Sequence, residues 1–235
     1  METPASAIKG QVIPRRVHLR PAGWVEPSEA FPRFAGRGGF IWLDSGMERE
    51  RDGRWSFLMC EPFALLRGGA GRFEIVEGAR SLPAPGNPFD ALGALLGRWR
   101  VNGGEYPAPP FTGGAAGFFG YGLLNYCEPS TRLVKSAAAA EGDAWIGLYD
   151  RVIAFDHHAR RVTLIANLEE SQAPGAALDE LERSLTENTA RFLPPAPGRV
   201  EARSNFTRAS FMAAVERVRA GITTLKEINR VTFVE

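Results

Sequence analysis

The chain has 235 residues, a length that allows one large domain or two small ones. Hydrophobic residues make up 44% and charged residues 23%, which is typical of a globular protein and excludes a largely disordered chain. The net charge of +1 argues against nucleic acid or an anionic membrane surface as a partner. With only Cys60, Cys127 and three histidines, a disulfide scaffold or a cysteine zinc site is not expected.

The amino-terminal sequence METPASAIKGQVIPRR lacks the apolar core of a signal peptide. The uncharged stretch that follows Pro109 is interrupted by glycines and does not have the sequence of a continuous membrane-spanning helix. These features predict a soluble cytoplasmic protein with reduced thiols.

Short apolar runs separated by turn sequences occupy the first half of the chain, a pattern typical of antiparallel strands. Strands are predicted at 40–43, 55–59, 64–66 and 73–76, and the glycine-rich sequence at 68–71 predicts a turn between the last two. A helix is predicted next, because Asn87 is a suitable N-cap and the apolar residues that follow recur at helical spacing. These apolar residues are Phe89, Leu92, Leu95, Leu96 and Trp99.

The glycine-rich run at 113–122 does not have the G-x-G-x-x-G spacing of a dinucleotide site, and no lysine follows it to complete a P-loop. Glycines between aromatic residues instead predict close backbone approach in a sheet. Three further strands are predicted at 145–148, 152–155 and 162–166. Residues 156–160 form the expected hairpin turn, which places His157 and His158 in a turn rather than at a metal.

Two helices are predicted in the last third, one over 176–192 and one capped by Thr207. The second is expected to bury Phe211, Val215, Val218 and Ile222, and the proline-rich segment 194–198 between the two helices predicts a linker. The order of elements predicts an α+β fold of largely antiparallel sheets with a few flanking helices.

Polar residues at predicted strand ends are candidate ligand contacts, although the residues alone identify no catalytic constellation. Ser45 lies in Asp-Ser-Gly rather than in the G-x-S-x-G elbow of a serine hydrolase. It could hydrogen-bond a ligand, and Arg54 could bind a carboxylate. The alternative is that Arg54 pairs on the surface with Glu48, Glu50 or Asp52.

Four segments together resemble component I of aminodeoxychorismate synthase and, more distantly, component I of anthranilate synthase. They are Trp42 to Pro62 with its Asp-Ser-Gly and Arg-Trp-Ser sequences, the glycine-rich stretch from Phe111 to Tyr121, the segment from Asp143 to Asp150 that leads into the hairpin, and Asn205 to Arg208. Their order and spacing agree with the family pattern. The resemblance implies the amino-terminal fold of anthranilate synthase component I over residues 1–200. Residues 201–235 would begin a chorismate-binding domain whose sequence diverges after Gly221.

The resemblance also implies a reaction, the amination of chorismate towards para-aminobenzoate and folate. In the family the complete enzyme uses magnesium and receives ammonia from a glutamine amidotransferase subunit or domain. The family's catalytic lysine, acid and base residues and magnesium-binding glutamates follow the segment that this chain matches. We therefore expect no catalytic or metal-binding residue here, and a chain truncated before the catalytic domain.

An amino-acid pocket that holds tryptophan is the remaining site implied by the resemblance. Its residues correspond to Ser45, Arg54, Leu43 and Trp55, with the other half of the pocket contributed by the chorismate-binding domain. Two alternatives stay open. The chain could be a stand-alone, non-catalytic module that binds an amino acid or a glutamine amidotransferase, or the product of a decayed gene.

Overall fold

The computed structural model describes residues 12–45, 53–84, 86–99, 101, 109–128, 142–186, 198 and 207–221. Two compact units divide the chain, residues 1–193 and residues 194–235. The predicted linker at 194–198 lies outside the described residues except for Gly198.

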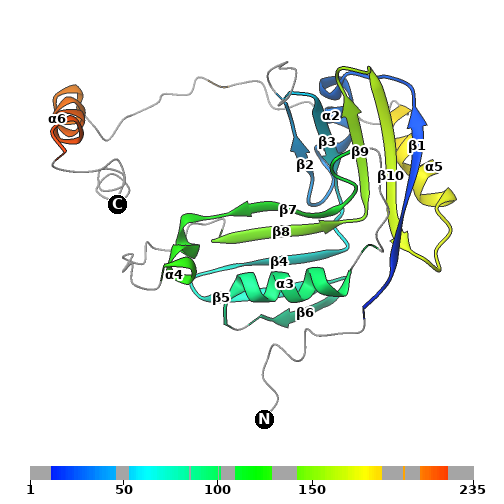
Figure 1. Ribbon diagram of the computed structural model, residues 1–235, viewed down its shortest axis with the longest axis horizontal. Helices are drawn as coiled ribbons and strands as arrows, with labels where there is room; N and C mark the ends of the chain where they lie inside the picture. Colours follow the sequence, from blue (N-terminus) through cyan, green and yellow to red (C-terminus); the bar gives the residue numbers. More distant parts are fainter. Residues whose placement is uncertain are drawn as a thin grey trace, which may run out of the picture. The chain divides into compact units, whose positions relative to one another are not determined.

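Two five-stranded sheets, both antiparallel, form the larger unit (Figure 1). The first sheet has the order β1 (Arg15–Ala22), β10 (Arg161–Glu169), β9 (Arg151–Asp156), β3 (Trp55–Met59) and β2 (Ile41–Leu43). The second has the order β6 (Arg80–Pro83), β5 (Arg72–Glu77), β4 (Ala64–Gly69), β8 (Ala144–Tyr149) and β7 (Gly114–Phe119). With the flanking helices, these sheets confirm the predicted α+β class.

The helices among the described residues of the larger unit are α2 (Pro27–Phe34), α3 (Pro88–Arg98), the 3-10 turn η1 (Tyr121–Leu123), α4 (Leu124–Cys127) and α5 (Gly175–Thr186). The apolar sides of α2 and α5 pack on one face of the first sheet, where Phe34, Phe155 and Leu181 are buried together. Helix α3 packs on the second sheet through Leu95. A third cluster, which includes Phe57, joins the other face of the first sheet to the second sheet.

The second sheet continues into the first through a single residue. Strand β8 ends at Tyr149, strand β9 begins at Arg151, and only Asp150 lies between them. The hydroxyl of Tyr149 donates a hydrogen bond to the carbonyl oxygen of Gly39 at 2.6 Å. This corner therefore fixes the crosswise arrangement of the two sheets seen in Figure 1.

The glycine-rich run forms strand β7, which confirms its structural interpretation. Gly117 has φ 156°, and a Cβ there would clash with the carbonyl oxygen of Trp145 on the neighbouring strand β8. Glycine is thus required for the close approach of two backbones rather than for a phosphate.

The predicted helix cap and hairpin are confirmed. The Asn87 side chain accepts a hydrogen bond from the Phe89 amide at 2.9 Å at the start of α3. Residues 157–160 form the turn between β9 and β10. The helix predicted over 176–192 is described as α5, and residues 187–192 lie outside the described residues.

Helix α6 (Arg208–Arg219) of the smaller unit is capped as predicted, because the Thr207 hydroxyl accepts from the Ser210 amide at 3.1 Å. The expected burial of its apolar face is wrong: Phe211 is 55% exposed and Val215 is 36% exposed. Val218 is half-buried, and Ile222 lies outside the described residues. Within the described part of the smaller unit, α6 has no second layer of structure against which to bury that face.

Strand β1 and helix α2 were not predicted. The sequence of β1 is dominated by polar residues such as Arg16, His18 and Arg20, so its alternation of buried and exposed positions is hidden. Helix α2 contains Pro32, which argues against a helix when the sequence is considered alone. Both elements are stabilised by distant parts of the chain, β1 by β10 and α2 by α5 and β3.

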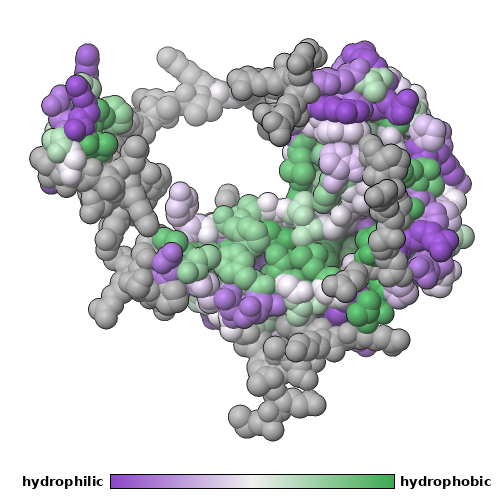
Figure 2. Space-filling view, in the orientation of Figure 1, coloured by the Kyte–Doolittle hydropathy of each residue, from purple (hydrophilic) through white to green (hydrophobic). Residues whose placement is uncertain are grey.

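An apolar surface covers part of the second sheet, as Figure 2 shows over β7 and β8. Phe118, Phe119 and Tyr121 are 42%, 52% and 91% exposed, so the aromatic side chains of this segment are uncovered. Residues 145–155, in contrast, are mostly buried, because β8 and β9 are internal strands of their sheets.

We predict that the isolated chain associates with itself at high concentration, because exposed apolar patches promote association. Light scattering should show species larger than a monomer, together with binding of a dye that recognises apolar surface. The double substitution Phe118→Ser and Tyr121→Ser should reduce both signals. Leu82→Ser is the matched control, because Leu82 is 48% exposed on β6 at the opposite edge of the same sheet. A strict monomer without dye binding would contradict this prediction.

Candidate functional site

Two of the four predicted pocket residues share one face of the first sheet. In the β2–β3 pair Leu43 lies opposite Phe57, and Trp55 is two positions from Phe57 on the same strand. Residues that are opposite each other or two apart in a sheet point to the same side, so all three side chains share a face. The Trp55 and Phe57 rings stack with centroids 6.2 Å apart, while Leu43 is 44% exposed. The end of this strand pair therefore offers an apolar, partly open surface.

Ser45 lies beside the same strand end and is held by two hydrogen bonds. Its hydroxyl donates to the carbonyl oxygen of Trp55 at 2.5 Å. Its backbone amide donates to the Ser56 hydroxyl at 3.2 Å. Because the Ser45 hydroxyl has used its only proton, it can offer a ligand just its acceptor lone pairs.

Arg54 is paired with Asp156 rather than with a described residue of its own loop. Its Nε and Nη2 donate to the Asp156 carboxylate at distances of 2.6–3.1 Å. The guanidinium carbon lies 5.0 Å from the centroid of the Trp55 ring. The proposed partners Glu48, Glu50 and Asp52 lie outside the described residues.

The pair leaves part of Arg54 available. Its side chain is 45% exposed, whereas that of Asp156 is 6% exposed. The hydrogen bonds from Arg54 hold the pKa of Asp156 below its ordinary value although burial opposes this, and the Ala159 amide contributes a further hydrogen bond at 3.1 Å. Asp156 is therefore an anion that neutralises Arg54, and the Arg54 Nη1 atom points to no hydrogen-bond partner among the described residues.

Sequence reasoning missed a buried polar group behind this surface. Ser56 has no exposed surface, and its hydroxyl lies 2.9 Å from Asp44 Oδ1 and 2.8 Å from His157 Nε2. The ring of His157 meets Trp24 edge-on with centroids 6.0 Å apart. The available signal was a serine next to the Arg54–Trp55 pair and a histidine at a strand end, but only the folded sheet brings these residues together.

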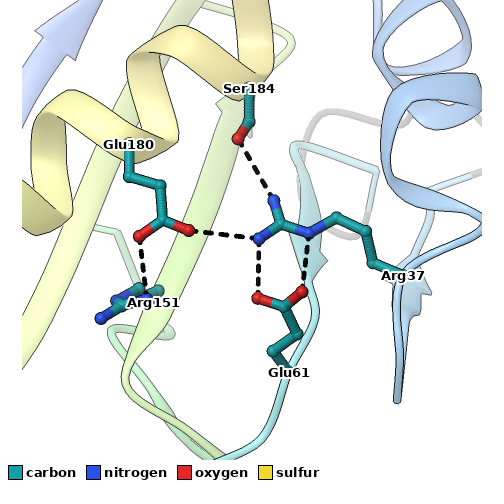
Figure 3. A network of polar contacts seen from close by, with 5 residues as sticks. All are labelled: Arg37, Glu61, Arg151, Glu180 and Ser184. Carbon is teal, nitrogen blue, oxygen red and sulfur yellow. Dashed lines mark hydrogen bonds and ion pairs between the residues drawn. The ribbon is translucent and has the colours of Figure 1, made fainter. Parts of the chain in front are cut away.

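A second polar cluster lies between α5, β9 and the segment before β4 (Figure 3). Arg37 donates to both carboxylate oxygens of Glu61, at 3.1 and 2.7 Å, and to Glu180 at 3.3 Å. Glu180 also accepts from Arg151 at 3.0 Å, and Ser184 completes the cluster. Two cations and two anions are thus matched, which is typical of a structural tie between a helix and a sheet.

Cys60 lines a small cavity next to that cluster, and neither Ser45 nor Arg54 takes part in the lining. The cavity measures about 10 Å³, room for about one water molecule. Burial raises the pKa of the Cys60 thiol to about 11. The thiol is therefore protonated at neutral pH and a poor nucleophile.

The described ranges contain no group of three or more His, Cys, Asp or Glu side chains arranged to hold a metal ion. Nor does any helix within them combine the length and apolarity that a membrane crossing requires.

Comparison with known proteins gives a consistent set of relatives. A family model described as chorismate binding enzyme matches residues 67–226. Aminodeoxychorismate synthase component 1 of Bacillus subtilis is 28% identical over 184 residues, which are 76% of this chain and 38% of that protein. Anthranilate synthase component 1 of Neisseria gonorrhoeae is 24% identical over 204 residues, 82% of this chain and 41% of that protein.

Among solved structures, anthranilate synthase component I from Streptococcus pneumoniae TIGR4 aligns with a TM-score of 0.49 and 20% identity. The alignment covers 84% of this chain and 44% of that one. The chain spans about two-fifths of the length of the curated relatives named above, 38% and 41%. The resemblance inferred from the sequence motifs is confirmed at the level of the family.

We predict that the Arg54–Asp156 pair stabilises the fold at neutral pH and ceases to do so in acid. Because the pKa of Asp156 is lowered in the folded state, its contribution is present above the ordinary carboxyl pKa and is lost as the pH falls through the folded value. At pH 7, Asp156→Asn should lower the midpoint of thermal unfolding by about 2–4 °C. The difference from the wild type should shrink below about pH 4.

The control for this prediction is Asp179→Asn, which removes a carboxylate that Arg20 binds at 2.7 Å. The Asp179 side chain is 60% exposed, so solvent screens that pair and the substitution should shift the midpoint less. Equal shifts for the two variants, or a difference at pH 7 that persists in acid, would contradict the assignment.

Proposed function

The chain belongs to the chorismate binding enzyme family, and from that premise we propose that it forms part of component I of an aminodeoxychorismate synthase. The observation that carries the proposal is the family match, which begins in β4 and extends beyond α6. The Asp-Ser-Gly sequence at 44–46 and the double glycine at 113–114 favour this branch over anthranilate synthase.

In this proposal the complete enzyme aminates chorismate towards para-aminobenzoate and folate, with ammonia from a glutamine amidotransferase partner. Residues 1–200 would correspond to the amino-terminal domain, and residues 201–235 would begin the chorismate-binding domain. The family's reaction uses magnesium. The described residues do not fit a magnesium site, so no ligand to that ion is assigned among them.

We further propose that Ser45, Arg54, Leu43 and Trp55 contribute one wall of an amino-acid pocket. The Nη1 atom of Arg54, which has no hydrogen-bond partner among the described residues, would bind the ligand carboxylate. The Ser45 hydroxyl would accept from the ligand ammonium group. Leu43 and Trp55 would contact an apolar side chain such as that of tryptophan. The grouping of all four residues at one end of the β2–β3 pair supports this assignment.

A stand-alone module that binds an amino acid or a glutamine amidotransferase is the second candidate. It is favoured by the three apolar clusters of the larger unit, each formed between sheets and helices of this chain. A domain with cores of its own can fold without a further segment.

An assay of chorismate amination distinguishes the component I proposal from the stand-alone module. Residues 1–235 alone, mixed with chorismate, ammonia and magnesium, should give no aminodeoxychorismate in a coupled lyase assay. The same chain joined to the remainder of Bacillus subtilis aminodeoxychorismate synthase component 1, in place of the 184 residues that it matches, should give product. That remainder without this chain is the control. A folded but inactive chimera would contradict the component I proposal and favour the module.

Tryptophan binding tests the pocket. Calorimetry with L-tryptophan should show weak binding to the wild-type chain, because the proposal assigns only one wall of the pocket to it. Arg54→Ala should abolish most of the heat, since the carboxylate loses its charged partner. Arg67→Ala is the matched control, because Arg67 is an exposed arginine of the second sheet that pairs with Glu74 at 2.7 Å. Equal heats for the wild type and Arg54→Ala would show that Arg54 has no role.

A further inference from the structure

The buried hydroxyl group of Ser56 has three hydrogen-bond partners. Its hydroxyl oxygen is within 3.2 Å of three groups, namely the Ser45 amide, Asp44 Oδ1 and His157 Nε2. The side chain is fully buried, so water does not compete for these positions.

Counting protons assigns a direction to each bond. A hydroxyl has one proton to donate and two lone pairs that accept. The Asp44 carboxylate can only accept, and the Ser45 amide can only donate. The Ser56 proton must therefore go to Asp44, and the second lone pair must accept a proton from His157 Nε2. If His157 carried its proton on Nδ1 alone, two lone pairs would face each other at 2.8 Å.

His157 is held in place on its other sides. Its backbone amide donates to the Arg54 carbonyl oxygen at 2.9 Å, and its ring rests against Trp24. The Trp24 indole donates to Glu26 at 3.1 Å, and Arg160 pairs with the same carboxylate at 2.9 Å. The backbone hydrogen bond and the Trp24 ring thus hold His157 beside Ser56, and Glu26 on the other side of Trp24 is paired with Arg160.

Two neighbouring residues at the end of β9 therefore bind two side chains at the start of β3. Asp156 holds the side chain of Arg54, and the next residue, His157, holds the side chain of Ser56. Ser56 in turn holds the backbone of Ser45. Arg54 and Ser45, the two polar residues of the proposed pocket, are both fixed by this one pair of neighbours.

We propose that His157 is a positioning residue: its Nε2–H, acting through the buried Ser56 hydroxyl, sets the orientation of Ser45 in the amino-acid site, an inference that rests on the function proposed above. His157 does not touch the ligand in this proposal. Its role is to keep the Ser45 hydroxyl on the Trp55 carbonyl oxygen, so that the lone pairs of Ser45 stay available to a ligand ammonium group.

The first test is the protonation state of the ring, which needs neither a ligand nor a variant. Nitrogen-15 NMR of the full chain, labelled in histidine, should show His157 protonated on Nε2. The exposed neighbour His158 serves as the internal reference. A His157 that is protonated on Nδ1 alone would overturn the proposal.

The second test follows hydrogen exchange of the Ser45 amide. Ser56→Ala removes the acceptor, and His157→Phe removes the donor that fixes it, so each should speed exchange by about threefold to tenfold. His157→Gln places an amide N–H where Nε2 was and should restore the wild-type rate. His158→Phe, a ring substitution at the exposed neighbour, should leave the rate unchanged. Identical rates in wild type, His157→Phe and His157→Gln would overturn the proposal.

A third measurement separates this inference from the function on which it rests. If the wild-type chain binds L-tryptophan, His157→Phe should weaken binding by about tenfold and His157→Gln should bind as the wild type does. Binding that is equal in all three chains would overturn the proposal. A wild-type chain that does not bind tryptophan would contradict the proposed pocket, and the NMR and exchange results would then decide whether His157 orients Ser45.

Discussion

The corner at Asp150 is the constraint on which the larger unit depends. The chain passes from the second sheet to the first there with only one residue between strands, so the sheets cannot shift independently. The Asp150 carbonyl oxygen accepts from the Asn167 amide at 2.7 Å, and the adjacent Tyr149 hydroxyl reaches Gly39. These bonds tie the corner to β10 and to the segment that leads into β2. A strand that changes sheets through a sharp bend is a common solution for crosswise packing.

A buried charge pair ties the same corner to strand β1 through the side chain of Asp150. Arg15, at the start of β1, is 5% exposed and reaches the Asp150 carboxylate at 3.5 Å. Burial raises the pKa of Asp150 and lowers that of Arg15. The attraction between the two ions opposes both shifts, with further contributions from Arg151 at Asp150 and from Glu169 at Arg15. The rings of Phe63 and Trp99, 4.4 and 4.9 Å from the Arg15 guanidinium carbon, offset part of that cost by cation–π attraction. The pair therefore contributes to the alignment of β1, α3 and β4.

Local chemistry made part of this fold predictable. The Asn87 cap, the turn at 157–160 and the close-packed Gly117 follow from short-range rules and are confirmed. Strand β1 depends on pairing with β10, more than 100 residues away, and a sequence pattern rich in arginine did not reveal it. The polar residues of the proposed pocket follow from motifs, and His157 is assigned from the sequence only to a turn. Its contact with Ser56 is not predicted, because only the β3–β9 pairing brings the two side chains within 2.8 Å of each other.

The distribution of donors and acceptors also bears on which ligand suits this surface. The Ser45 hydroxyl donates its proton to the Trp55 carbonyl oxygen and offers a ligand only lone pairs. Asp156 neutralises the charge of Arg54, and the Arg54 Nη1 atom has no hydrogen-bond partner among the described residues. A zwitterion, with one ammonium and one carboxylate, matches that arrangement. Chorismate carries two carboxylates and no cation. Its hydroxyl group is therefore its only hydrogen-bond donor for the lone pairs of Ser45. The polar chemistry at the end of β2 and β3 is thus better matched by an amino acid than by chorismate, which agrees with the ligand that we propose for this surface.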